Sequence, residues 1–511
     1  MKMMKRVLSA ALLIAITGTQ TIYAQSGDMG YFGGISQGTR LPSTTEQILQ
    51  NAGTNRARAE SMPYKEMIML DGIPYEFEGL LTVRRANNAI KPGVDVGTYN
   101  ETYVVQATTS GDATTNLSRT ITFRVNYRIE GNQTIKDYTA TTWNETIATP
   151  NSTYVLDQDR SQFGVSILED STPGVKYYKG NISQTAVYAG GQTGVTTHTT
   201  EGSFYGYESA WSNTEVHRID GIVSNSNWQM QYQVRPSVSV SKRLNYTQNE
   251  PTAISFAGNY REIMSNVSGM QYNIFVKPQE FYDVPDSGGT SISTYNTFEQ
   301  LIAPNVEYLR GHFAESDIRK LFSMQILQGD PKHFQPNQEM LRGQFIMALS
   351  RAIKLPVEQP QQATGRNARN APITIVFPDV TPDRPTYPYI MAAFNAGFAK
   401  GSNNGYFYEE SPISREEAVA IMLRTLGLTN LGLDNTPITV FTDDYKVSDW
   451  ARGELSAAHR IGLIYADDEG NINPTDNITK AEAAALINRL IEYMRSDIAL
   501  DYMDNIVNYP S

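Results

Sequence analysis

Apolar and polar residues alternate along much of the N-terminal half of the chain. Apolar residues occupy every second position of the clearest stretch: Ile121, Phe123, Val125, Tyr127 and Ile129. The turn sequence Glu130-Gly131-Asn132 follows it directly. A period of two is typical of strands with one buried face. Many such stretches, rich in Thr, Tyr and Val, predict an all-β sandwich or barrel over residues 63–285.

Beyond about residue 300 the apolar spacing becomes helical, and it repeats three times. The repeats align on the basic residues Arg342, Arg415 and Lys480. Apolar residues stand three, seven and eleven positions after each one: Phe345, Leu349 and Ile353; Ala418, Met422 and Leu426; Ala483, Ile487 and Ile491. This spacing places them on one helix face. One repeat cannot bury its stripe alone, so the three are predicted to pack together.

Two of these helices begin with the signal for a capping box. Ser414 with Glu417, and Thr479 with Glu482, have the spacing at which side chain and backbone cap each other reciprocally. The next residue, Arg415 or Lys480, would oppose the helix macrodipole by ~0.3–1 kcal/mol. We expect free backbone N–H groups and the basic side chain to converge there on a carboxylate or phosphate. The alternative is a solvated surface cation.

The sequence around these helices resembles S-layer homology repeats. The resemblance is carried by Phe377-Pro378-Asp379-Val380, by residues 393–428 with their turn glycine and aromatic loop, and by residues from 441 onward. It implies an all-α, pseudo-threefold cluster of three repeats, at residues 300–355, 374–428 and 438–495. The first repeat departs most from the pattern, because Leu341-Arg342-Gly343-Gln344 lacks the capping hydroxyl.

The resemblance also implies a binding function. Repeats of this family bind anionic secondary cell-wall polymer, commonly a pyruvylated sugar, in grooves between repeats. Carried over by position, the polymer-binding residues would be Arg342, Arg415, Lys480, Trp450, Phe313, Gly329 and Gly401. The cations would hold the carboxylate, the rings would face the sugar, and the glycines would permit close approach. Asp379 and Asp443 are expected to cap the helices that follow them.

Differences among the repeats predict unequal grooves. Ala466 replaces the turn glycine of the third repeat, which weakens the expected fit of the third groove. Leu341 provides no cap in the first repeat, so we expect the first groove to be the least active.

Composition and the chain ends set the cellular context. Residues 1–24 have the pattern of an export signal, with Lys2, Lys5 and Arg6 before an apolar run. The chain has no cysteine, so we expect core packing rather than disulfides to hold an exported protein together. A formal net charge of −11 disfavours nucleic acid and anionic membranes as general partners. No later segment approaches the roughly 20 apolar residues of a membrane-spanning helix.

The sequence offers little support for catalysis. Gly34-Ile35-Ser36-Gln37-Gly38 matches a nucleophile elbow, but the strand and helix expected around it are not predicted. The five histidines show no metal-ligand spacing. We therefore expect no catalytic residues, no metal and no cofactor.

The remaining segments complete the expected organisation of a multidomain protein. Residues 25–62 are expected to include a short helix near Ser43 and Glu46, residues 356–373 a loop, and residues 496–511 a tail. Together these observations predict a secreted, non-catalytic surface protein anchored to the cell wall and displaying its β domain. Two alternatives stay open: a wall-anchored glycan-active enzyme and a self-assembling S-layer lattice subunit.

Overall fold

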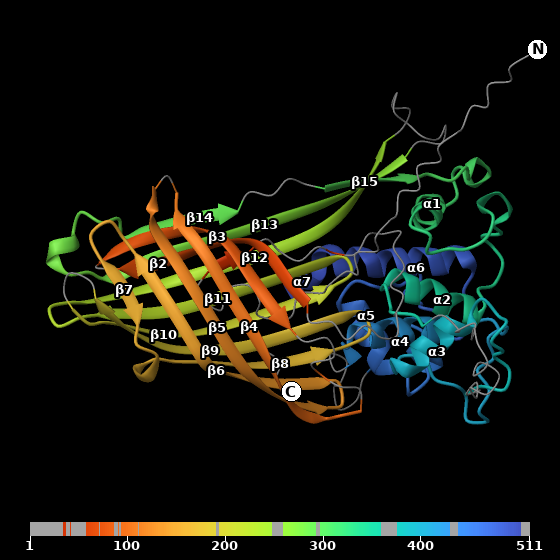
Figure 1. The fold of residues 1–511 in the computed structure, drawn as a ribbon. Coiled ribbons are helices and arrows are strands. Elements are labelled where there is room, and N and C mark those ends of the chain that lie inside the picture. Colours follow the sequence, from red (N-terminus) through yellow and green to blue (C-terminus); the bar gives the residue numbers. More distant parts are fainter. Residues whose placement is uncertain are drawn as a thin grey trace, which may run out of the picture.

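The computed structural model describes residues 34–36, 41, 58–70, 72–85, 90, 93–110, 112–190, 194–247, 259–292, 297–358, 376–429 and 438–501. The expected export signal, the expected helix near Ser43 and Glu46, and most of the expected loop 356–373 and tail 496–511 lie outside these residues. Within the described ranges the chain forms an N-terminal β domain and a C-terminal helical cluster (Figure 1).

The β domain is one antiparallel sheet of 15 strands among the described residues. The strands are β1 (Gly34–Ser36), β2 (Arg58–Leu70), β3 (Ile73–Arg85), β4 (Val96–Thr109), β5 (Asp112–Glu130), β6 (Gln133–Ala148), β7 (Thr153–Leu156), β8 (Gln162–Ser171), β9 (Val175–Gly190), β10 (Thr196–Ser209), β11 (Ser212–Ser224), β12 (Gln229–Thr247), β13 (Asn259–Val276), β14 (Ser287–Ile292) and β15 (Thr297–Ile302). The predicted boundary at residue 285 is too early, because β14 and β15 both pair with β13.

The sheet curls until its two ends meet. Lys65 Nζ on β2 lies 3.4 Å from Thr290 Oγ1 on β14, and Glu76 on β3 accepts a hydrogen bond from the same hydroxyl. Phe123 and Val125 on β5 are fully buried, and they belong to one apolar cluster with residues of strands from β2 to β11. The predicted sandwich or barrel is therefore a single curled sheet.

The helical cluster contains two main helices per repeat. They are α1 (Glu315–Ser323) and α2 (Arg342–Ala352), α3 (Tyr387–Asn395) and α4 (Arg415–Leu426), and α5 (Arg452–Arg460) and α6 (Lys480–Glu492), followed by α7 (Ile498–Asp501). None of the helices in the described ranges is long and apolar enough to cross a membrane.

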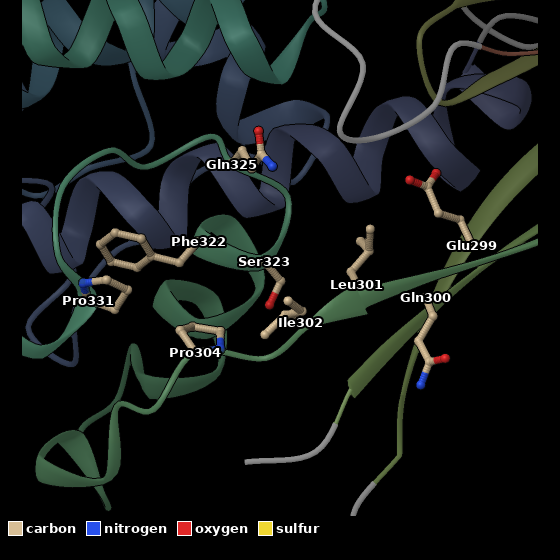
Figure 2. Close-up of a pocket in the computed structure, with 9 residues that line it drawn as sticks. All are labelled: Glu299, Gln300, Leu301, Ile302, Pro304, Phe322, Ser323, Gln325 and Pro331. Carbon is tan, nitrogen blue, oxygen red and sulfur yellow. The ribbon is translucent and has the colours of Figure 1, made fainter. Parts of the chain in front are cut away.

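A pocket of about 440 Å³ lies where the two parts adjoin, between β15 and α1 (Figure 2). It is lined by Glu299, Gln300, Leu301, Ile302, Pro304, Phe322, Ser323, Gln325 and Pro331. None of these is a residue that the sequence singled out for binding.

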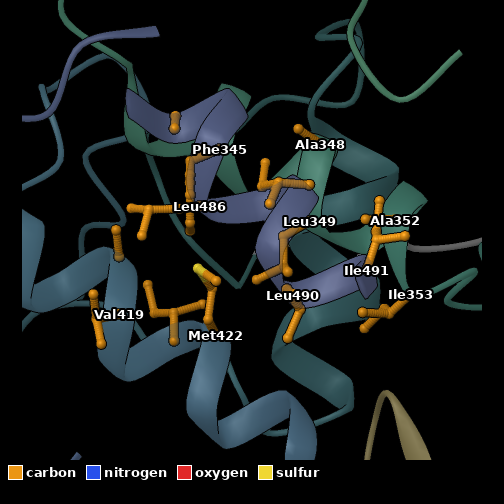
Figure 3. Close-up of a cluster of buried hydrophobic side chains, with 14 of the residues drawn as sticks. Phe345, Ala348, Leu349, Ala352, Ile353, Val419, Met422, Leu486, Leu490 and Ile491 are labelled. Carbon is orange, nitrogen blue, oxygen red and sulfur yellow. The ribbon is translucent and has the colours of Figure 1, made fainter. Parts of the chain in front are cut away.

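The predicted helical stripes form the core of the cluster. All nine stripe residues, from Phe345 to Ile491, are buried and belong to one contiguous apolar core. Figure 3 shows Leu349 of α2, Met422 of α4 and Ile491 of α6 gathered in it. The prediction that the three repeats pack together is confirmed.

A ring of backbone hydrogen bonds relates the three repeats. The Met340 N–H donates to the Ile478 carbonyl at 2.8 Å, the Ile478 N–H to the Ile413 carbonyl at 3.1 Å, and the Ile413 N–H to the Met340 carbonyl at 3.0 Å. Each residue lies just before the second helix of its repeat. The ring therefore gives the cluster its approximate threefold arrangement and brings the starts of α2, α4 and α6 together.

The β domain contacts the other ends of the same helices. The Tyr177 hydroxyl donates to the Leu426 carbonyl of α4 at 3.1 Å, and the Ser212 hydroxyl donates at 2.5 Å to the carbonyl of Met494, just beyond α6. The last carbonyls of a helix lack hydrogen-bond donors within it, and at the end of α4 the Tyr177 hydroxyl of the β domain provides one. The starts of α2, α4 and α6 consequently lie at the end of the cluster remote from the β domain (Figure 1).

Candidate functional site

The three basic residues Arg342, Arg415 and Lys480 are the first residues of α2, α4 and α6. Their backbone N–H groups donate to the carbonyls of Ser411, Asp476 and Gln338, at 2.9, 2.9 and 2.8 Å. Each acceptor belongs to a loop of a different repeat. The expectation that free helix N–H groups would help to bind an anion is therefore wrong at these first helical residues.

α4 and α6 begin with complete capping boxes. The Ser414 hydroxyl accepts from the Glu417 N–H at 3.3 Å, and the Ser414 N–H donates to the Glu417 carboxylate at 3.3 Å. Thr479 and Glu482 make the same pair of bonds at 3.2 and 2.7 Å. α2 follows Leu341, which provides no side-chain cap. The capping glutamates are thus fixed in place at two of the three helix starts.

These two glutamates also pair with cations of the preceding repeat. Arg342 Nη1 lies 3.0 Å from Glu417 Oε1, and Arg415 Nη2 lies 2.7 Å from Glu482 Oε1. Burial alone would raise the pKa of Glu482, but the Thr479 N–H and the Arg415 guanidinium outweigh it and hold the pKa below its usual value. The neighbouring repeat therefore supplies the anion that a cation at a helix start requires. Sequence reasoning recognised these glutamates only as caps.

Lys480 has a different environment. The third residue of α2, equivalent to Glu417 in α4 and Glu482 in α6, is Gln344. Lys480 Nζ donates to the side-chain oxygen of Gln338 at 2.6 Å, and no ion pair joins it to a carboxylate in the described part of the chain. Burial lowers the pKa of Lys480. This junction, between the third and first repeats, holds a cation without a paired acid.

Two aromatic rings accompany the cations, but they are not the rings predicted. The Arg342 guanidinium lies 5.1 Å from the Phe407 ring centroid, and Lys480 Nζ lies 6.0 Å from that of Phe334. Both rings come from the loop between the two helices of a repeat, so their equivalent positions could have identified them. Trp450 and Phe313 are 50% and 69% exposed. Among the described residues, no cation–π pair joins either ring to the three cations.

The two glycines differ in their surroundings. Gly329 has φ +100°, and a side chain there would meet open space. A Cβ on Gly401 would lie 2.5 Å from the Phe377 ring. Arg342 Nη2 donates to the carbonyl of the preceding residue, Lys400, at 3.0 Å. Gly401 is therefore close to a cation, and its small size is required by packing.

Asp379 and Asp443 do not cap the helices that follow them, so that expectation is wrong. Asp379 accepts from the N–H groups of Phe407 and Tyr408, at 2.9 and 2.6 Å. Asp443 accepts in the same way from Ile472 and Asn473, at 2.9 and 2.8 Å. In the second and third repeats, the carboxylate thus accepts from two adjacent N–H groups of the loop between the two helices, which has no regular structure to pair them. They position the loops rather than the helices.

Three segments of the chain match the family model described as S-layer homology domain, at residues 309–346, 376–419 and 440–484. A 205-residue stretch is 29% identical to an amylopullulanase of Thermoanaerobacterium thermosulfurigenes, covering 40% of this chain and 10% of that protein. Another of 186 residues is 28% identical to exoglucanase XynX of Acetivibrio thermocellus, covering 36% and 16%. A third of 178 residues is 25% identical to an S-layer protein of Bacillus licheniformis, covering 35% and 18%. The chain thus matches less than a fifth of the length of each relative, and the matches cover its repeat region alone.

Proposed function

We propose that this chain, which carries three S-layer homology domains, is held on the bacterial cell wall by non-covalent binding of an anionic secondary cell-wall polymer. The observation that carries the proposal is the gathering of Arg342, Arg415 and Lys480 at one end of the threefold cluster. S-layer homology domains indicate a secreted, surface-associated protein, where such a polymer is available.

The chemistry of this end suits a charged saccharide. Guanidinium and ammonium groups bind carboxylates and phosphates through charge-assisted hydrogen bonds. The half-buried Phe334 ring lies beside Lys480, and the exposed rings of Phe313 in the first repeat and Trp450 in the third add flat apolar surface. Because the polymer repeats along its length, several weak contacts on one chain raise the effective concentration of the next. The protein would be retained by the sum of these contacts.

We further propose that the β domain is displayed outward and is not catalytic. It contacts the helix ends remote from the three cations, so polymer binding leaves it facing away from the wall. Two of its carboxylates, Glu66 and Glu145, are buried and each lies 2.7 Å from Arg119, where a glycan has no access. Ser36 of the elbow-like motif is fully buried in β1.

Sedimentation with wall material tests the anchor. Residues 25–511 would be mixed with purified sacculi before and after acid removal of the secondary polymer. We expect the protein to pellet only with untreated sacculi, and the triple variant Arg342→Gln, Arg415→Gln, Lys480→Gln to stay in the supernatant. Arg218→Ala, on an exposed side chain of β11, is the control and should pellet normally. Equal pelleting with both kinds of sacculi, or with neither, would refute the proposal.

The two alternatives have their own tests. The amylopullulanase and exoglucanase relatives show that such repeats occur in proteins named as glycan-active enzymes. Hydrolysis of wall glycan by the purified chain would replace the proposal of a passive β domain. Ordered sheets of purified protein in electron micrographs would instead indicate a lattice subunit.

A further inference from the structure

β15, the last strand of the β domain, is paired along one of its two sides. It pairs with β13 and with no other strand in the described ranges. In an antiparallel pair, alternate residues direct their backbone N–H and C=O groups toward the partner strand, and the residues between them direct theirs away from it. A strand edge without a neighbour therefore presents hydrogen-bonding groups to a further strand.

The pocket of about 440 Å³ follows this same strand (Figure 2). Four consecutive residues of β15, from Glu299 to Ile302, line it. Successive side chains of a strand point to opposite faces of a sheet, so a pocket bordered by all four lies along the edge of the strand and not over one face. Phe322, Ser323 and Gln325 line it from α1 and the turn that follows. The pocket is thus a slot between the β15 edge and the first repeat.

The residues around the slot favour a basic occupant. Leu301, Pro304 and Phe322 contribute apolar surface. Glu299 is the one charged residue among the nine that line the slot, and Lys354, which interacts electrostatically with Glu299, is not among them. An anionic polymer would meet a like charge there, whereas a lysine or arginine side chain would meet an opposite one. The slot therefore suits an extended peptide with apolar and basic side chains.

We propose that the β15 edge is a docking site for a protein partner, which adds an extended segment to the sheet as a further antiparallel strand. The segment carries an apolar side chain opposite Leu301 and a basic one opposite Glu299. Backbone hydrogen bonds supply affinity, and these two side chains supply specificity. The inference goes beyond the proposed wall anchor and does not depend on it, because none of the three cations at the helix starts lines the slot.

A synthetic peptide with a fluorescent label, acetyl-Thr-Val-Thr-Lys-Val-Thr-amide, tests the proposal on residues 25–511. Antiparallel to β15, its first valine lies opposite Leu301 and its lysine opposite Glu299. We expect fluorescence anisotropy to show saturable binding. The same peptide with glutamate in place of lysine should bind at least tenfold more weakly. Equal binding of the two peptides, or binding of neither, would overturn the proposal.

Two variants of the protein place the binding at this edge. Glu299→Gln should weaken binding of the lysine peptide at least fivefold, whereas Glu307→Gln, at an exposed position a few residues further on, should leave it within twofold. Ile302→Lys changes a side chain that is 59% exposed, and it should weaken binding at least tenfold. Its matched control is Ile222→Lys, on an exposed side chain of β11. Full binding by both Glu299→Gln and Ile302→Lys would contradict the assignment.

The absence of cysteine from the chain allows the register to be tested by a single disulfide. Opposite residues of paired strands have Cβ atoms ~4.5–5.5 Å apart, which is close to the separation that a disulfide requires. Gln300→Cys should therefore form a disulfide with a peptide that has cysteine at its third position. A peptide with cysteine at its last position should react far more slowly. Equal rates would show that the peptide does not lie as a strand in fixed register, against the proposal.

Sedimentation velocity distinguishes a separate partner from a second copy of this chain. We expect the parent protein alone to show no association through the β15 edge. A concentration-dependent dimer that Ile302→Lys abolishes would assign the edge to self-association and overturn the proposal of a separate partner. Failure of the protein to bind sacculi would remove the anchor and leave this result unchanged.

Discussion

The indole nitrogen of Trp211, in the turn between β10 and β11, donates a hydrogen bond of 2.8 Å to the carbonyl of Ala352, the last residue of α2. Trp211 is fully buried. Tyr177 makes the corresponding contact at the end of α4, and Ser212 contacts the carbonyl of Met494 in the helical turn after α6. One end of the β domain therefore contacts the C-terminal region of the second helix in all three repeats, and we expect the two parts of the molecule to stabilise each other.

Replacing Trp211 with phenylalanine should destabilise the protein by about 1–3 kcal/mol, because the buried Ala352 carbonyl loses its donor. Urea unfolding followed by circular dichroism measures this difference. Trp450→Phe changes a ring that is 50% exposed and should stay within about 0.5 kcal/mol of the parent. Equal free energies of unfolding for the two variants would show that the Trp211 contact contributes nothing.

Gly427→Ala should cost more stability than Gly405→Ala. Both glycines have a left-handed backbone, with φ +70° and +82°, so alanine costs about 1–2 kcal/mol at either position. At Gly427 the new Cβ would also lie 2.2 Å from Thr172 Cγ2, whereas at Gly405 it meets nothing.

Thermal unfolding of these variants, and of the double variant Gly427→Ala, Thr172→Ser, isolates the steric contribution. Serine lacks the clashing methyl group but keeps the hydroxyl that donates to the Thr425 carbonyl at 3.0 Å. We expect it to recover most of the excess cost at Gly427. If the double variant is no more stable than Gly427→Ala alone, the extra loss of stability at Gly427 does not come from the contact with Thr172 Cγ2.

The sequence predicted what depends on local spacing. Phe345, Leu349 and their counterparts follow a short repeated period, and the same period buries them in the structure. The pairing of Arg415 with Glu482 joins residues 67 positions apart, and no local pattern states which repeat lies next to which. The curl of the sheet likewise brings Lys65 into contact with Thr290, 225 positions away, and no local pattern indicates that contact. Asp379 was misassigned because a carboxylate before a helix and one beneath a loop have the same sequence signature.

Glu482→Gln should weaken the protein in a pH-dependent way. The folded-state pKa of Glu482 lies below its usual value of 4.5. The stability that this carboxylate contributes is therefore present above pH 4.5 and is lost as the pH falls through the folded pKa. At pH 7 we expect the variant to be less stable by at most about 1 kcal/mol, since the group is partly exposed and screened.

Urea midpoints measured from pH 7 downward test this expectation. The difference between the parent and Glu482→Gln should close below pH 4.5. Glu201→Gln, on an exposed side chain of β10, controls for the loss of one negative charge. A difference that persists unchanged to low pH would mean that shape, not charge, makes Glu482 stabilising.

Lys354→Met should stabilise the protein. Lys354 lies just after α2 and is only 8% exposed. Burial, together with the nearby cations Lys242 and Arg351, lowers its pKa from 10.5 to about 7, although Glu262 and Glu299 oppose the shift. Between these two values the unfolded chain binds more protons than the folded one, so the stability of the parent rises with pH across this window. Each pKa unit corresponds to about 1.4 kcal/mol.

Removing the amine should therefore raise the free energy of unfolding by a few kcal/mol at pH 7, with the gain shrinking as the pH approaches 10.5. The left-handed backbone at this position, φ 53°, is equally strained for lysine and methionine and cancels from the comparison. Lys332→Met, in an exposed short helix, is the matched control and should show no such trend. If Lys354→Met is instead less stable than the parent at pH 7, the ammonium group is held by Glu262 and Glu299 as a stabilising charge inside the fold.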